Sequence, residues 1–234
     1  MQAWKKQINK WLNRDDPVAL NDPAWAAYMA QFKQKFSKSK PIRDQRFIVL
    51  DTETTGLDFR KDQILSVGAI GVQDFEINIA DRFECYLNQE NYRPGDSIKI
   101  HGISSNRTRK GIPEREMLVQ FLAYCRNSII VGHHIGFDLA ILNEAVSKHF
   151  GTSLKNKVID TGLLAQRLES IQPVYPIDRS RYSLDALCQQ FHITVKKRHT
   201  ASGDAFITAI LFLKLLARLE KRGVKNLHQL LANQ

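Results

Sequence analysis

The stretch FIVLDTETTG, residues 47–56, places two acidic residues directly after a run of four apolar ones. The apolar run is typical of a buried β-strand, in which successive side chains point to opposite faces. Asp51 and Glu53 are two positions apart, so they share one face while Thr52 points to the other. Two adjacent buried carboxylates are costly unless a cation lies between them. The segment therefore either ends at the surface, where water solvates the acids, or carries a site for a hard cation such as Mg²⁺.

The pattern after residue 46 predicts an α/β fold in which helices flank a mixed sheet. Three successive strands, expected to be antiparallel, are predicted over 47–52, 63–73 and 76–88. Helices and short buried strands then alternate, over 114–126, 128–132, 137–150 and 158–159, and three helical stretches end the chain. Strands that come first and α/β alternation that follows favour a mixed sheet.

A basic helical extension is predicted over residues 1–44. Residues 1–46 hold ten Lys/Arg against four Asp, and so contribute +6 of the net charge of +10. One amphipathic helix is expected from Trp4 to Leu12, and a second from Pro23 to about Phe36, with Asp22 as its N-cap. The simplest interpretation is a brace that packs on the rest of the chain, residues 45–234. A docking helix for a protein partner and a contact with an anionic membrane are the alternatives.

The whole-chain composition favours a reduced compartment and a polyanionic partner. A net charge of +10 attracts nucleic acid, although a merely basic surface gives the same value. The start lacks a secretory signal and the apolar runs are too short to span a bilayer, so a cytoplasmic protein without a transmembrane segment is expected. Cys85, Cys125 and Cys188 form no CxxC pair and are expected to be reduced, mostly buried thiols.

Two further segments carry acidic residues in patterns that suit metal chemistry. In VGHHIGFDLAIL, residues 131–142, Asp138 lies in the first turn of a predicted helix, where it is either a helix cap or an oxygen ligand. The two histidines of this segment lack a third ligand at zinc-site spacing. In KKRHTASGDAF, residues 196–206, Asp204 begins an apolar helix and His199 lies on a basic loop. His199 is either a solvated loop residue or, beside clustered carboxylates, a general base.

Taken in order, DTETTG (51–56), HHIGFD (133–138) and HTASGDA (199–205) resemble the three exonuclease motifs of the DnaQ-like 3′-5′ exonucleases. This DEDDh family includes the proofreading epsilon subunit of bacterial DNA polymerase III. The resemblance covers about residues 45–220. It implies a ribonuclease-H-like fold with a five-stranded mixed sheet. The related DEDDy enzymes place a tyrosine four residues before the last Asp, where this chain has Thr200.

The resemblance also implies the catalytic roles. Asp51, Glu53, Asp138 and Asp204 would be the metal-binding carboxylates and His199 the base. Two divalent cations, Mg²⁺ or Mn²⁺, would activate the attacking water and neutralise the leaving 3′ oxygen. We expect these ions, rather than Lys or Arg side chains, to compensate the acidic pair.

Substrate contacts are expected from the turn after the acidic pair and from two other segments. Thr54, Thr55, Gly56 and Leu57 would grip the terminal nucleotide, as they do in relatives. IHGIS, residues 100–104, resembles a family segment near that nucleotide and adds His101 and Ile103. His134 stands where many relatives have Asn and is a further candidate. Phosphate contacts are expected from basic residues on two loops: Arg107, Arg109, Lys110, Lys196, Lys197 and Arg198.

The predicted activity is metal-dependent removal of nucleoside 5′-monophosphates from the 3′ end of single-stranded DNA, in proofreading or repair. Two alternatives remain open at this stage. One is an RNA 3′-end trimming enzyme of the same fold, because the motifs do not discriminate the sugar. The other is a non-catalytic nucleic-acid-binding module, disfavoured because all five motif residues are present.

Overall fold

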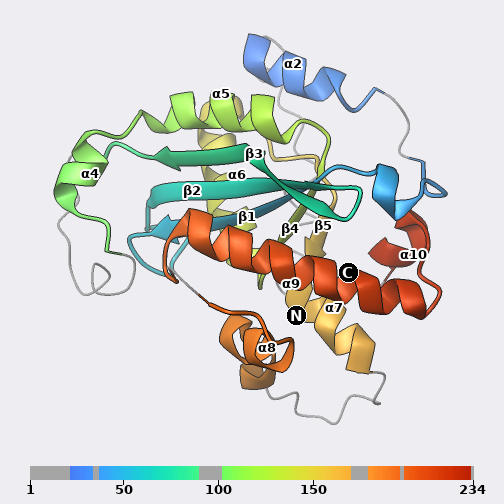
Figure 1. Ribbon diagram of the computed structural model, residues 1–234. Helices are drawn as coiled ribbons and strands as arrows, with labels where there is room; N and C mark the ends of the chain where they lie inside the picture. Colours follow the sequence, from blue (N-terminus) through green and yellow to red (C-terminus); the bar gives the residue numbers. More distant parts are fainter. Residues whose placement is uncertain (1–21, 34–36, 90–101, 170–178, 196–197, 233–234) are drawn as a thin grey trace.

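The structure, a computed structural model, describes residues 22–33, 37–89, 102–169, 179–195 and 198–232 (Figure 1). Its centre is a five-stranded sheet with the order β3-β2-β1-β4-β5. The strands are β1 (Phe47–Thr54), β2 (Ile64–Gln73), β3 (Glu76–Tyr86), β4 (Ile129–Gly132) and β5 (Val158–Asp160). The first three strands pair antiparallel, whereas β4 and β5 are added parallel to β1. The mixed sheet predicted from the sequence is confirmed.

Helices cover both faces of this sheet. They are α2 (Pro23–Ala30), α4 (Ser105–Arg109), α5 (Glu114–Cys125), α6 (Gly136–Phe150), α7 (Thr161–Glu169), α8 (Leu184–Gln190), α9 (Ala201–Lys221) and α10 (Leu227–Leu231). Two 3₁₀ turns, η2 (Ile42–Asp44) and η3 (Arg179–Tyr182), lie between them. Four α-helices therefore follow β5 in the described residues, where three were predicted. The three predicted stretches had no bounds; the shortest of the four helices, α10, has too few residues to show a helical period, although its Asn226/Gln229 capping box is a readable signal.

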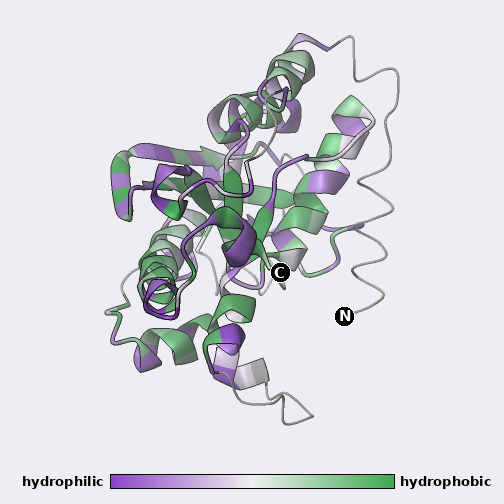
Figure 2. Ribbon diagram, turned by 90° about the vertical axis from the view of Figure 1, so that its right-hand side faces the viewer, coloured by the Kyte–Doolittle hydropathy of each residue, from purple (hydrophilic) through white to green (hydrophobic). Residues whose placement is uncertain are grey.

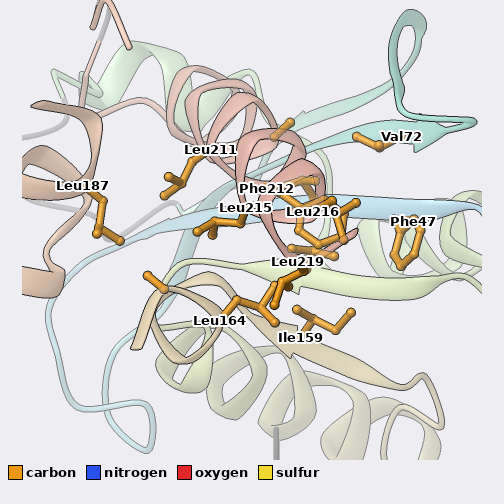
Figure 3. Packing of buried hydrophobic residues seen from close by; sticks show 14 of the residues in the cluster. Phe47, Val72, Ile159, Leu164, Leu187, Leu211, Phe212, Leu215, Leu216 and Leu219 are labelled. Carbon is orange, nitrogen blue, oxygen red and sulfur yellow. The ribbon is translucent and has the colours of Figure 1, made fainter. Parts of the chain in front are cut away.

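Successive side chains of β1 point to opposite faces of the sheet, and each face has its own hydrophobic core. Phe47 and Val49 join a core that α9 closes with α7, α8 and α10. Ile48 and Leu50 join a second core, closed by α2, α5 and α6. Figure 3 shows how α9 side chains such as Phe212 point toward Phe47 of the sheet. In Figure 2 the central strands are mainly hydrophobic, whereas the helices show mixed colouring, as expected for elements that bury one side.

Helix α2 packs on the rest of the structure through two aromatic side chains. Trp25 and Tyr28 are both buried, and the Trp25 ring lies 5.7 Å from that of Phe150. The Tyr28 hydroxyl accepts a hydrogen bond of 2.8 Å from the Lys155 N–H. These contacts agree with the brace interpretation for this helix.

The predicted limits of the N-terminal helices are only partly confirmed. Asp22 caps α2, with Pro23 in the first turn, as predicted. The helix ends at Ala30 rather than near Phe36, because the Gln31 N–H bonds to Tyr28 O in a tighter, 3₁₀-like turn. Phe36 and the helix predicted from Trp4 to Leu12 lie outside the described residues.

The cysteines and the helix lengths bear on two further expectations. The three cysteines are buried and free, as predicted. Within the described ranges, the helices are too short or too polar to cross a membrane.

Candidate active site

The acidic pair lies where β1 leaves the core. Residues of β1 are fully buried as far as Leu50 and half-buried from Asp51 to Thr54. Phe47 and Val49, which point to the same face of β1 as the two acids, pack against α9. Because alternate side chains share a face, Asp51 and Glu53 both point to the α9 side. Their spacing predicted the shared face, but not the helix that lies on it.

A glycine in β2 lets the start of α9 approach these acids. Gly68 pairs with Asp51 in the antiparallel register. A Cβ at position 68 would lie 2.3 Å from the backbone N of Ser202, in the first turn of α9. No side chain fits in that space, so the helix backbone rests directly on the strand. Asp204, also in the first turn, is thereby carried to the acidic pair.

Three of the four predicted metal ligands meet in one cluster. Carboxylate oxygens of Asp51, Glu53 and Asp204 all lie within 4.8 Å of one another. The Thr200 side chain caps α9 by accepting a 3.2 Å hydrogen bond from the Gly203 N–H. Hard oxygen donors at this separation are the ligands that Mg²⁺ and Mn²⁺ prefer, so the residues present fit a divalent cation.

The electrostatics of the cluster favour a cation. Burial, and then the neighbouring carboxylates of Asp138 and Asp204, raises the pKa of Asp51 well above its usual range. Burial, followed by Asp204 and Asp138, raises the pKa of Glu53 from 4.5 to about 7. Ionisation of the whole cluster is therefore unfavourable without a compensating positive charge.

Asp138 lies beside the cluster and contacts the other face of β1. Its Oδ1 accepts hydrogen bonds from the Thr52 N–H at 2.9 Å and from the Thr52 hydroxyl at 2.7 Å. Parallel pairing of β1 with β4 ends at Val49, three residues earlier, so the carboxylate takes the place of a neighbouring strand. Burial raises the pKa of Asp138 to about 6, and the Thr52 hydrogen bonds partly oppose the rise.

An arginine supplies a positive charge that was expected only from metal. The Arg198 guanidinium donates from Nη1 to Asp204 Oδ1 at 2.5 Å and from Nε to Asp185 Oδ1 at 3.0 Å. Its charge opposes the raised pKa values of Asp51 and Glu53. The expectation of compensation by metal concerned Asp51 and Glu53, whereas the carboxylate that Arg198 binds directly is Asp204.

The predicted base lies at the edge of the same cluster. His199 is exposed, and its backbone N–H donates to Asp204 Oδ2 at 3.2 Å. Its φ of +62° is the left-handed conformation, which few non-glycine residues adopt. Strained backbone of this kind is frequent at functional sites. The structure thus joins His199 to the cluster through its main chain.

The predicted nucleotide-binding turn is held by its own hydroxyl groups. Thr54 donates to Gly56 O at 2.7 Å, and Thr55 donates to Asp62 Oδ1 at 2.8 Å. A Cβ at Gly56 would lie 2.6 Å from the Asp62 carboxylate, so a larger residue would displace the side chain that Thr55 binds. Leu57, at the end of the turn, is 88% exposed, so its apolar side chain is accessible to a ligand.

The second predicted contact segment is only partly described. Ile103 is buried and packs with Leu65 and Tyr86. The Arg107 guanidinium lies over the Tyr86 ring, 4.0 Å from its centroid. His101, Lys196 and Lys197 lie outside the described residues.

The two histidines before α6 differ in their surroundings. His134 is exposed, and its backbone N–H donates to Asp160 Oδ1 at 3.3 Å. Nδ1 of His133 lies 2.9 Å from the Thr161 hydroxyl. Burial, and then the adjacent His134 ring, lowers the pKa of His133 to about 3, so this ring is neutral at physiological pH. The neutral His133 ring therefore links this loop to Thr161 at the start of α7.

Sequence reasoning missed three residues that shape the site. Gly68 was detectable, because a glycine inside an apolar strand often marks a close backbone approach. Thr52 was correctly predicted to lie on the opposite face from the acids, but its hydrogen bonds to Asp138 were not predicted. Asp185 carries no local signal, because its contact with Arg198 depends on how α8 packs beside α9.

One family model and several bacterial proteins match most of this chain. The family model for RNase T, described as exonuclease, matches residues 48–212, which include Asp51, Asp138 and Asp204. The DNA polymerase III of PolC type from Thermotoga petrophila is 30% identical over 197 residues, which are 84% of this chain and 14% of that protein. The corresponding protein from Caldanaerobacter subterraneus is 28% identical over 193 residues, 82% of this chain and 13% of its own length. The chain thus spans about one seventh of these relatives.

Solved structures show the same fold. Exonuclease I from E. coli, in complex with a dT13 oligonucleotide, superimposes with a TM-score of 0.62 at 17% identity. The match covers 77% of this chain and 43% of that one. Exonuclease X with 5′ overhanging duplex DNA gives a TM-score of 0.56 at 22% identity, over 73% of this chain and 91% of that one.

Proposed function

The chain belongs to the RNase T exonuclease family, of the DnaQ-like 3′-5′ type, and on that premise we propose that it removes nucleotides from the 3′ end of single-stranded DNA. The products are nucleoside 5′-monophosphates, and the cofactors are two divalent cations, Mg²⁺ or Mn²⁺. The observation that supports this best is the approach of Asp51, Glu53 and Asp204 to within 4.8 Å of one another.

Each part of the site has a role in this proposal. Asp51, Glu53, Asp204 and the adjacent Asp138 hold the ions. When bound, divalent ions activate the attacking water and neutralise charge on the leaving 3′ oxygen. The imidazole of His199 takes the proton from that water, and its exposure lets the proton pass to solvent.

Substrate is held next to the cluster by apolar surface. The exposed Leu57 side chain and the turn that carries it lie directly after Glu53 in the chain. Contact of apolar side chains with a base does not depend on its identity, which suits an enzyme that must accept every terminal nucleotide. Thr54, Thr55 and Gly56 shape the turn, and Ile103 and His134 are further contacts with the nucleotide in this proposal. Exonuclease I, which shares the fold, has been solved with dT13, and this favours DNA as the substrate to test first.

A nuclease assay on matched oligonucleotides tests the proposal. Single-stranded DNA and RNA of one sequence, labelled at the 5′ end, are incubated with Mg²⁺, Mn²⁺ or EDTA. We expect DNA to shorten stepwise from its 3′ end only with metal, and mass spectrometry to identify 5′-monophosphates. Asp51→Asn should abolish the reaction, whereas Glu220→Gln, which removes a charge from the exposed far end of α9, should not.

Three results would contradict parts of this proposal. Cleavage that survives both EDTA and Asp51→Asn would exclude metal-dependent hydrolysis at this cluster. Much faster shortening of RNA would make the enzyme an RNA 3′-end trimming exoribonuclease. Binding without any cleavage would indicate a non-catalytic module.

The PolC-type relatives suggest a proofreading or repair role, which we include in the proposal. A preference for primer ends with a 3′ mismatch over matched ends is the expected result. Equal rates on both ends would remove support for proofreading. A protein partner at the N-terminal segment is also proposed, and it would be detected by cross-linking a polymerase to residues 1–44.

A further inference from the structure

Arg198 connects two carboxylates that belong to different helices. Asp204 is in α9 and its side chain is 10% exposed, whereas Asp185 is in α8 and its side chain is 70% exposed. The guanidinium reaches the first through Nη1 and the second through Nε. The partner of Nη1, Asp204, therefore lies inside the metal cluster, whereas the partner of Nε, Asp185, lies at the protein surface.

Both oxygens of Asp204 already accept hydrogen bonds. Arg198 Nη1 donates to Oδ1 at 2.5 Å, and the His199 N–H donates to Oδ2 at 3.2 Å. A divalent ion that binds Oδ1 would lie about 2.1 Å from it. The ion and Nη1 would then be at most about 4.6 Å apart, and two positive charges at that distance in a half-buried site repel strongly.

We propose that the Arg198 guanidinium and a divalent ion compete for Asp204, and that Arg198 withdraws to Asp185 when the ion binds. The inference rests on the metal site of the proposed function. Arg198 is then a positioning residue. It keeps Asp204 and the neighbouring His199 oriented before metal binds, and it lowers the affinity for the ion.

Asp185 has a definite part in this exchange. Its exposed carboxylate gives the displaced guanidinium a partner outside the cluster. Without the Asp185 charge, the Arg198 guanidinium has no partner once it leaves Asp204. The metal ion then displaces it from Asp204 less favourably. Loss of Arg198 and loss of Asp185 should therefore change the metal affinity in opposite directions, which a merely structural ion pair would not do.

Mn²⁺ binding to the full chain, measured by calorimetry and by the electron paramagnetic resonance of free Mn²⁺, tests the competition. We expect Arg198→Gln to bind Mn²⁺ about ten-fold more tightly than wild type, within the usual range for coupled sites. Asp185→Asn should bind a few-fold more weakly, and in the Arg198→Gln background it should have no effect of its own. Arg218→Gln, which removes a cation from the other end of α9, is the matched control.

The outcomes separate this inference from the proposed function. Unchanged or weaker Mn²⁺ binding in Arg198→Gln, with wild-type binding that Asp51→Asn abolishes, would overturn the competition and leave the metal site intact. Absence of Mn²⁺ binding in both wild type and Arg198→Gln would overturn both. Circular dichroism shows whether Arg198→Gln folds. If it does not, Arg198→Met serves instead, and it should bind Mn²⁺ more tightly than wild type because it also carries no charge to compete with the ion.

Discussion

Replacement of Glu53 by glutamine should stabilise the protein in EDTA at pH 8 and have little effect at pH 5. The Glu53 carboxylate is half-buried beside Asp51 and Asp204, and its pKa is raised from 4.5 to about 7. Below pH 4.5 the group is protonated in both the folded and the unfolded chain. As the pH rises from 4.5 to about 7, the unfolded chain releases the proton first, so the free energy of unfolding falls. Glutamine carries no charge and removes this loss.

The expected gain in the free energy of unfolding follows from the two pKa values of Glu53. A rise of the pKa from 4.5 to about 7 corresponds to about 3 kcal/mol if none of it is screened. Because the side chain is partly exposed, solvent screening reduces this figure to roughly 1–2 kcal/mol. For a chain of this length, such a change raises the melting temperature by about 3–6 °C.

Differential scanning calorimetry of wild type, Glu53→Gln and the control Glu220→Gln would measure it. Runs at pH 5 and pH 8 in EDTA give the pH dependence, and runs in Mg²⁺ give the effect of metal. Mg²⁺ should raise the melting temperature of wild type more than that of Glu53→Gln, because binding to the folded state stabilises it. A Glu53→Gln protein that melts below wild type in EDTA at pH 8 would refute the account of repulsion in the cluster.

Three further predictions concern other parts of the site and its support. His199→Asn keeps a residue that tolerates positive φ and should lower kcat by about 10²–10⁴-fold with unchanged Mn²⁺ affinity; an equal loss of Mn²⁺ binding would show that the imidazole does not act as the base. Gly68→Ala places a Cβ against the first turn of α9 and should cost at least about 1–3 kcal/mol of stability and weaken Mn²⁺ binding, measured by urea unfolding and calorimetry; unchanged values would mean that α9 is not held there. Trp25→Ala should lower stability by about 3–5 kcal/mol while the folded protein keeps its nuclease rate; a selective loss of rate would give α2 a role in catalysis.

Local patterns in the sequence predicted the sheet and the acidic pair. The strands were predicted because apolar residues are continuous where β1 and β2 are buried. Asp51 and Glu53 were assigned to one face by the two-residue period alone, which holds however the chain is packed. Asp204 was related to them by the motif order, and the structure brings the three together.

Contacts that depend on packing were not predicted. The run KKRH indicated phosphate contacts, but the guanidinium of Arg198 lies between two carboxylates because α8 and the start of α9 meet there. Side chains of this length reach partners that no local pattern identifies. Helix α10 is hard to predict for a different reason, since five residues are too few to show a helical period.

The short length of β4 has a consequence for the architecture of the site. Strand β1 extends past the last residue paired with β4, and the Thr52 N–H on that side bonds to the Asp138 carboxylate. If β4 continued alongside, its main chain would take that N–H and leave the Asp138 carboxylate without its place at β1. Because β4 is shorter than β1, the Thr52 N–H has no strand partner on that side and is free to bond to the Asp138 carboxylate of α6. Any homologous or engineered sheet that lengthens β4 would have to give up this carboxylate.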